Sequence, residues 1–312
     1  PQALAAAAAH GRDLGFGHLL LAGPLVEARV APSVAITADH GLGLLVDLDP
    51  AADFAVDGAD PRQTGGASGR NPARPSDDDA GRRVDRMAGQ LAGLAAAGVA
   101  GVRCMAPAAL AGADWRRVID RGRQARGDLR AIVWTHGVAA HVVAGLEDCG
   151  FDAAVASDAW WNMADDWLYQ EIARLSRIGS VLACPEVPFG PRLGETAGSA
   201  AAAQVAATRA LRLAPWLFDG LVLQAGFAWG DPDPLRPDAI PRPRPQHPAF
   251  DLAAAVRVTN AGFDRHPVDA AAAEATPQAP GRPLQVLTGD GGGLTALLID
   301  GDPAAADQPI HP

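Results

Sequence analysis

Residues 98–107, GVAGVRCMAP, and residues 131–137, AIVWTHG, decide the fold class of this chain. Each is a short apolar run that ends in a polar turn, which is the pattern of a buried strand. Residues 114–126 lie between them and carry Trp115 and Ile119 at helical spacing. A strand, a helix and a strand in this order form the repeating unit of a parallel sheet.

The same alternation continues along most of the chain. Further apolar runs predict strands at residues 16–22, 43–48, 151–156, 180–184 and 221–224, and a weak eighth strand at residues 25–30. Helical patterns fall at residues 34–40, 85–97, 141–149, 166–178, 200–213 and 250–263. We therefore expect an α/β fold, a (β/α)8 TIM-type barrel. An open doubly wound sheet is the alternative, but no GxGxxG follows the first strand, which disfavours a dinucleotide site.

Composition changes along the chain suggest three parts. The barrel is expected at residues 1–266, with a long irregular insertion at residues 57–82 that is rich in Gly, Pro, Asp and Arg. An Ala/Pro-rich linker follows at residues 267–283. Residues 284–312 then form a short C-terminal β module, a hairpin around GDGGG. Because the chain opens at Pro1 rather than Met, we expect it to be part of a longer polypeptide.

The composition also excludes several functions. All 26 basic residues are Arg, so a catalytic Schiff-base lysine and a P-loop lysine are ruled out. The net charge of -10 argues against nucleic acid and anionic membranes as partners. No run reaches transmembrane length, and the three cysteines fit no CxxC pattern, so we expect buried thiols in a cytoplasmic protein. The histidines are scattered, so neither a metal site nor a cofactor is proposed.

The collinear order of several segments resembles the catalytic barrel of the α-amylase superfamily, and within it the α-1,4-glucan:maltose-1-phosphate maltosyltransferases. The resemblance runs over residues 14–263. It rests on LGFGHLLLAGP, HGLGLLVDLDPAADFAVDG, GVAGVRCMAP, WRRVIDRGRQARGDLRAIVWTHG, CGFDAAVASDAWWN and LQAGFAWGDPDPL. It implies a TIM-type barrel concerned with α-glucans, with an α-glucan or maltooligosaccharide as ligand.

The chain departs from that family where its chemistry resides. The family's nucleophile is an Asp two residues after an Arg; here Arg103 is followed by Met105 at that position. The family's general acid is a Glu three residues before a Thr, and Ile132 stands there, before Thr135. A third carboxylate falls near Phe189 in a loose alignment. Since a retaining mechanism needs two carboxyl groups, the resemblance implies a degenerate, non-catalytic member.

Side chains at the strand ends are the candidate site, because chemistry in such barrels sits there. Arginine can donate to hydroxyl groups and tryptophan can stack on sugar rings. The candidate substrate-binding residues are Arg103, His136, Trp160, Trp161 and Trp229. Structural roles are the alternatives. Arg103 would then pair with Asp47 or Asp49, His136 would be an exposed loop residue, and the tryptophans would pack against Phe189 and Phe227.

Three functions follow from these residues. The first is a non-catalytic glucan-binding or scaffolding domain that serves the rest of a longer polypeptide or a catalytic glucan enzyme. The second is an active α-1,4-glucan transferase or hydrolase that uses Asp158, Glu186 and Asp49 as substitute carboxylates. The third is a purely structural interaction domain whose mouth is filled by side chains.

Overall fold

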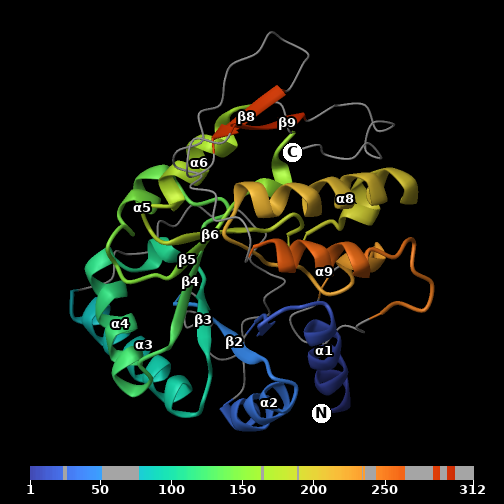
Figure 1. Ribbon diagram of the computed structural model, residues 1–312. Helices are drawn as coiled ribbons and strands as arrows, with labels where there is room; N and C mark the ends of the chain where they lie inside the picture. Colours follow the sequence, from blue (N-terminus) through green and yellow to red (C-terminus); the bar gives the residue numbers. More distant parts are fainter. Residues whose placement is uncertain are drawn as a thin grey trace, which may run out of the picture.

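The computed structural model describes residues 1–23, 27–50, 77–162, 165–187, 190–233, 235, 244–263, 284–288 and 294–298. Its main feature is a seven-stranded parallel sheet in which strands adjacent in sequence are adjacent in space (Figure 1). The strands are β1 (His18–Leu21), β2 (Gly43–Leu48), β3 (Gly101–Cys104), β4 (Arg130–Trp134), β5 (Ala153–Val155), β6 (Ser180–Ala183) and β7 (Gly220–Leu221). Sequential order without a switch point is the topology of a TIM-type barrel, as the alternation predicts.

Helices connect the strands and cover the outside of the sheet (Figure 1). They are α1 (Gln2–Asp13), α2 (Glu27–Asp39), α3 (Asp77–Ala96), α4 (Gly112–Ala125), α5 (Ala140–Ala144), α6 (Trp167–Leu175), α7 (Leu193–Thr196), α8 (Ala200–Leu217) and α9 (Ala253–Gly262). α3 packs along α4, and α8 packs along α9. Short 3-10 turns, η3 (Pro107–Ala109), η4 (Asp158–Trp160) and η5 (Phe227–Trp229), follow the ends of β3, β5 and β7.

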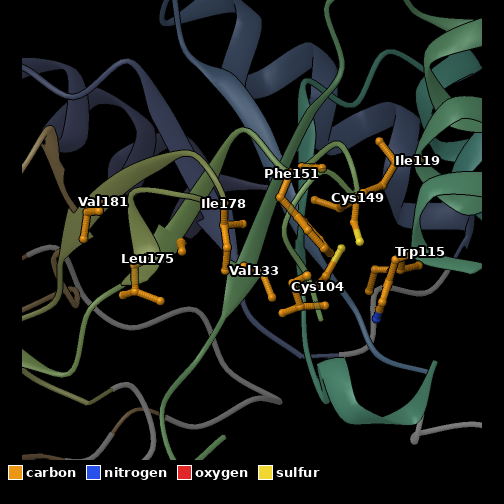
Figure 2. Close-up of a cluster of buried hydrophobic side chains, with 14 of the residues drawn as sticks. Cys104, Trp115, Ile119, Val133, Cys149, Phe151, Leu175, Ile178 and Val181 are labelled. Carbon is orange, nitrogen blue, oxygen red and sulfur yellow. The ribbon is translucent and has the colours of Figure 1, made fainter. Parts of the chain in front are cut away.

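The alternation of side chains along each strand separates the outer core from the barrel interior. On β3, Val102 and Cys104 point to the helices, where they join a buried cluster with Trp115 of α4 and Phe151 (Figure 2). The rings of Trp115 and Phe151 lie 5.6 Å apart, and the Trp115 indole donates to the Pro107 carbonyl at 2.9 Å. Burial of each such side chain contributes about 1.5–3 kcal/mol. This core holds the strands in register.

Glycine sets how closely α4 approaches its neighbours. Gly122 lies on the buried face of α4, and a Cβ there would meet Leu129 at 2.6 Å and Leu91 at 2.7 Å. Gly101 at the start of β3 is equally restricted, because a Cβ would lie 2.5 Å from the Arg130 carbonyl oxygen. Both glycines are therefore needed for close packing rather than for an unusual backbone conformation.

Two expectations about local structure are wrong. Residues 27–30 belong to α2, so the part of the expected weak strand at 25–30 that is described is helical. Burial of Val30 and Thr37 on one face of α2 favours the helix despite Pro32. Residues 77–82 are the first part of α3, so the described end of the expected insertion at 57–82 is regular.

Other expected parts can be followed only in places. Residues 57–76, the rest of the expected insertion, and the linker at 267–283 lie outside the described residues. In the C-terminal part, β8 (Leu284–Thr288) pairs antiparallel with β9 (Leu294–Leu298), which confirms the hairpin. That residues 284–312 form a separate module stays a prediction.

Candidate functional site

The carboxyl ends of β2, β3 and β4 bring an ion pair and an aromatic ring together. Asp47 and Arg103 are direct partners in the β2–β3 register. The Arg103 Nε and Nη2 atoms donate to the two Asp47 carboxylate oxygens at 2.7 and 2.9 Å, and both side chains are buried. The Gly23 amide donates to the same carboxylate at 2.7 Å. The Arg103 guanidinium also lies 5.0 Å from the centre of the Trp134 ring. Of its two expected roles, pairing with Asp47 is the one the structure shows.

An aromatic stack continues outward from Trp134. The His136 ring lies 3.9 Å from the Trp134 ring and 4.9 Å, edge-on, from the Trp160 ring. His136 is half-buried rather than an exposed loop residue, and its Nε2 contacts the Ala156 carbonyl. Burial lowers the pKa of His136 to about 4, so the imidazole is neutral at physiological pH. Trp160 completes the stack and remains 57% exposed. The arrangement presents one indole to solvent on a rigid aromatic support.

The turn that carries Trp160 is fixed by two carboxylates. Glu171 of α6 accepts from the Ser157 amide at 2.9 Å and from the Ser157 hydroxyl at 2.8 Å. Asp158 accepts from the Cys184 amide at 2.6 Å, which ties the end of β5 to the end of β6. Burial of its carboxyl group raises the pKa of Asp158 to about 7. Sequence reasoning identified Asp158 but missed Glu171, because nothing in the spacing links α6 to this turn.

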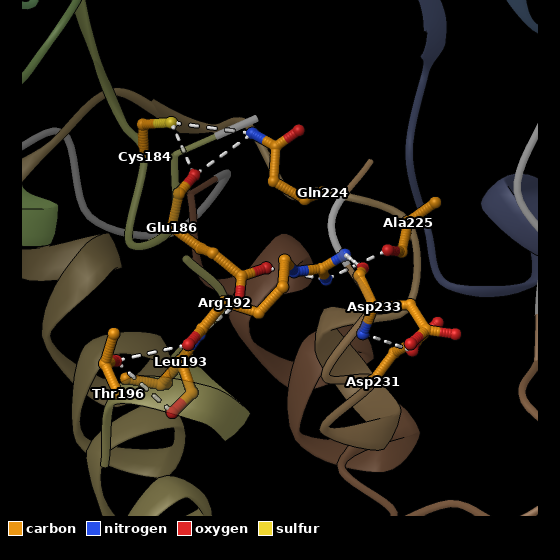
Figure 3. A network of polar contacts seen from close by, with 9 residues as sticks. All are labelled: Cys184, Glu186, Arg192, Leu193, Thr196, Gln224, Ala225, Asp231 and Asp233. Carbon is orange, nitrogen blue, oxygen red and sulfur yellow. Dashed lines mark hydrogen bonds and ion pairs between the residues drawn. The ribbon is translucent and has the colours of Figure 1, made fainter. Parts of the chain in front are cut away.

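Glu186 lies in a buried polar network after β6 (Figure 3). Its carboxylate lies 2.7 Å from the Arg192 Nη2 atom and accepts from the Leu193 amide at 2.7 Å. Arg192 is fully buried and also donates to the carbonyl groups of Ala225 and Asp233 at 3.0 and 3.1 Å. The network joins the segments that follow β6 and β7. The Glu186 carboxylate is therefore held by a cation and an amide.

Arg192 was not identified from the sequence. The available signal was weak: Arg192 is a basic residue within a Gly- and Pro-rich segment that follows an expected strand.

Two of the three candidate tryptophans belong to the core. Trp161 is 9% exposed, and its indole donates to the Asp165 carbonyl at 2.7 Å. Trp229 is 5% exposed and lies in a cluster with Phe227, between His10 and Arg244. Most of each indole is therefore buried, although Trp229 also lines the cavity inside the sheet. Trp160 is the candidate tryptophan with an exposed face, and the binding roles of Trp161 and Trp229 stay predictions.

The residues that stand where the family has its catalytic carboxylates lie at or near the strand ends. Met105 directly follows β3 and is half-buried, with its amide bonded to the Leu48 carbonyl at 2.9 Å. Ile132 lies on β4 and faces the barrel interior. Asp49 is half-buried just after β2. Phe189, near which the third carboxylate of the family falls, lies outside the described residues.

The interior of the curled sheet holds a cavity of about 690 Å³. Ile132, Val155 and Leu182 line it from the inward faces of β4, β5 and β6, and Arg103 of β3 also lines it. The cavity is mostly apolar, and it lies beneath the mouth rather than at the exposed Trp160.

The part of the chain that the structure describes contains neither a metal-binding cluster nor a membrane-spanning helix. No group of three or more His, Cys, Asp or Glu side chains is arranged to hold a metal ion. No described helix has the length and apolar character needed to cross a membrane. The three cysteines, Cys104, Cys149 and Cys184, are free and buried, as expected.

Part of this chain is similar in sequence to a known enzyme. No protein-family model matches the chain. The α-1,4-glucan:maltose-1-phosphate maltosyltransferase of Burkholderia pseudomallei (strain K96243) is 34% identical over 185 residues. The match covers 57% of this chain but only 16% of that protein. The chain is therefore related to a small part of a much longer enzyme.

Solved structures of α-amylases share the fold. The α-amylase of Malbranchea cinnamomea matches with a TM-score of 0.62 and 13% identity, over 95% of this chain and 77% of that chain. The α-amylase of Geobacillus thermoleovorans, complexed with acarbose, gives a TM-score of 0.61 and 8% identity, over 91% of this chain and 76% of that chain. At these identities the likeness concerns the fold alone. The sequence relative and the shared fold together support the assignment of this chain as a domain of the α-amylase superfamily.

Proposed function

We propose that this domain binds α-glucan chains without transferring or hydrolysing them. In this role it serves the rest of a longer polypeptide, or a catalytic glucan enzyme, as a binding or scaffolding part. The observation that carries the proposal is the exposed Trp160 indole, backed by His136 and Trp134 at the strand ends. A sugar ring can stack on such a face, and the rigid support keeps the entropy lost on binding small. The sequence relative is named for its action on an α-1,4-glucan, which supports this choice of ligand.

The carboxylates at the strand ends support a non-catalytic role. A retaining glycosyl mechanism needs two carboxyl groups about 5–5.5 Å apart, one as nucleophile and one as acid and base. Met105 and Ile132, at the positions the family uses, can perform neither step. Glu186 is held by Arg192 and the Leu193 amide, so its carboxylate already has a structural role between these partners.

One observation favours the active alternative. A general acid works best when its pKa is near the operating pH, and burial raises the pKa of Asp158 to about 7. In an active transferase or hydrolase, Asp158 would donate the proton, with Glu186 or Asp49 as its partner. Its hydrogen bond to the Cys184 amide gives Asp158 a structural role as well, and this role alone accounts for its position.

Fluorescence titration tests the binding role. Titration of the protein with maltoheptaose should give a saturable change in tryptophan fluorescence at millimolar sugar, because a single stacked indole supplies only weak binding. Trp160→Ala should abolish the change without lowering thermal stability, since the side chain is exposed. Val258→Ala on α9 removes another exposed apolar side chain and is the matched control. A flat response in the unmodified protein would leave the purely structural role.

Turnover assays test the absence of catalysis. The purified protein is incubated with maltose-1-phosphate or with maltooligosaccharides, and released phosphate and changes in chain length are measured. We expect neither. Turnover that disappears in Asp158→Asn or Glu186→Gln would establish the active alternative and overturn this part of the proposal.

The proposed location is the cytoplasm. Cys104, Cys149 and Cys184 are all free, and free thiols suit a reducing compartment. Fractionation of cells that express the tagged protein tests the assignment.

A further inference from the structure

The exposed Trp160 indole follows a segment of chain in which successive residues are tied to different neighbours. The Thr135 hydroxyl donates to the Val155 carbonyl, and the His136 ring contacts the Ala156 carbonyl through its Nε2 atom. Both of these contacts come from the residues that directly follow β4. They fix the end of β5, and the turn η4 that carries the indole begins only after it.

Two carboxylates hold the next two residues. The Asp158 carboxylate, in η4 itself, accepts from the Cys184 amide at 2.6 Å. Just ahead of it, Ser157 donates its amide to Glu171 Oε2 at 2.9 Å and its hydroxyl to Glu171 Oε1 at 2.8 Å. The Trp160 amide in turn donates to the Ser157 carbonyl at 3.1 Å, which closes the turn. The hold on Ser157 is thus passed to Trp160 through one backbone hydrogen bond.

Glu171 differs from the other partners of this segment because it stands on a helix. Its helix, α6, is anchored to the core by a buried apolar face, whereas Glu171 itself is half-buried. Both of its oxygens accept from the same residue, and hydrogen bonds to a charged acceptor are about twice as strong as neutral ones. Within the described residues, the hydrogen bonds of this carboxylate all go to Ser157. Glu171 therefore acts on the indole only through the turn.

The orientation of an exposed indole matters for a weak ligand such as a sugar ring. A side chain that must be ordered on binding lowers the affinity, and one that is already fixed does not. The His136 ring lies edge-on to Trp160 at 4.9 Å and supports the indole. The backbone from which the indole projects is fixed separately, by the hydrogen bonds of Ser157 and Asp158.

We propose that Glu171 is a positioning residue for α-glucan binding, which acts through Ser157 to hold η4 in the conformation that presents the Trp160 indole. The inference rests on the proposed glucan-binding role, and it adds a residue that does not touch the sugar. Without the Glu171 carboxylate, Ser157 loses the acceptor of both its donors and the turn gains freedom. The indole must then be ordered when the sugar binds. In a merely structural role, Glu171 would stabilise the connection between β5 and α6 with no effect on the sugar.

The first experiment observes the indole without sugar. Protein labelled with 5-fluorotryptophan gives a fluorine resonance for each tryptophan, and the Trp160 resonance is identified by its loss in Trp160→Phe. Glu171→Ala should shift or broaden this resonance. Glu171→Gln, which keeps the size of the side chain and one acceptor oxygen, should change it less and serves if Glu171→Ala does not fold. Glu147→Ala removes a carboxylate that lies 3.7 Å from Arg177 and is the matched control. A Trp160 resonance that is the same in both Glu171 variants as in the unmodified protein would overturn the proposal.

The second experiment follows the same resonance during titration with maltoheptaose. Glu171→Ala should raise the dissociation constant about three- to tenfold, which is the cost of ordering one side chain on binding. Ser157→Ala keeps the amide donor and should raise the constant less, and Ser157→Thr keeps both donors and should leave it close to that of the unmodified protein. A lower melting temperature with an unchanged dissociation constant would show a merely structural role and overturn the inference.

Failure of the proposed function gives a different result. If maltoheptaose leaves the Trp160 resonance of the unmodified protein unchanged, the indole does not bind this sugar and the proposed function fails, together with the role of Glu171 in binding. If the sugar shifts the resonance with the same dissociation constant in the unmodified protein and in Glu171→Ala, the proposed function holds and the positioning role alone fails.

Discussion

The buried pair of Arg103 and Asp47 gives a quantitative test of how the site is built. Arg103→Met keeps the aliphatic stem, removes two donors from the buried Asp47 carboxylate and leaves the hydrogen bond from the Gly23 amide. Breaking a buried pair from one side costs about 3–5 kcal/mol. Asp47→Leu should cost less, about 2–3 kcal/mol, because the buried Arg103 guanidinium keeps its contact with the Trp134 ring. Removal of both partners should restore most of the loss, since no buried charge remains.

The assay is urea unfolding followed by tryptophan fluorescence and circular dichroism, whose transitions must coincide for a two-state analysis. The larger loss corresponds to a fall in melting temperature of about 6–20 °C for a domain of this size. Losses below about 1 kcal/mol in both single variants would refute the reasoning, because they are typical of a solvent-screened surface pair. A double variant as unstable as the sum of the two single variants would also refute it.

Three further predictions concern packing, pH and thiol reactivity. Gly122→Ala should destabilise the protein by about 1–3 kcal/mol through contact with neighbouring leucines, whereas Gly89→Ala, in α3 with open space around it, should stabilise by about 0.5–1 kcal/mol; urea unfolding of both measures the difference in sign. Burial raises the pKa of Asp158 from 3.8 to about 7, so the folded protein holds this proton more tightly than the unfolded chain does. The free energy of unfolding should therefore be highest below pH 3.8 and fall as the pH rises to about 7, and Asp158→Asn should remove this fall when unfolding is measured across that range. Burial raises the pKa of each native thiol, so Ellman's reagent should react with none in the folded protein and with all three in urea: Cys104, Cys149 and Cys184.

Most of the sheet could be predicted from the sequence because each strand is a short apolar run between helical patterns. The error at residues 25–30 has a physical origin. Val30 and Val34 are β-branched and Pro32 removes a helical hydrogen bond, so local preference opposes a helix. Burial of Val30 against the core outweighs that preference, and burial is a tertiary effect that single-sequence reasoning does not capture.

The site was less predictable than the fold. The choice of Asp47 over Asp49 as the partner of Arg103 depends on strand register, which the sequence does not specify. The adjacent indoles of Trp160 and Trp161 carried a usable signal, because Trp160 ends a 3-10 turn and Trp161 follows it, so the two side chains point in different directions. The role of Arg192 depends on segments that meet only after folding.

The sequential order of the strands has a consequence for how the chain reaches this fold. Among the described strands, each pairs only with the strand before or after it in sequence, and at least one helix lies between the two. Paired residues are therefore far apart in the chain, as Leu45 and Gly101 are, and parallel pairing of this kind is slow to form. The most local groups in the sheet are its strand–helix–strand units. The unit of α3, β3, α4 and β4, with its buried Trp115, is the most extensively packed of these local groups. Structure can begin in this unit and grow strand by strand toward both ends of the sheet.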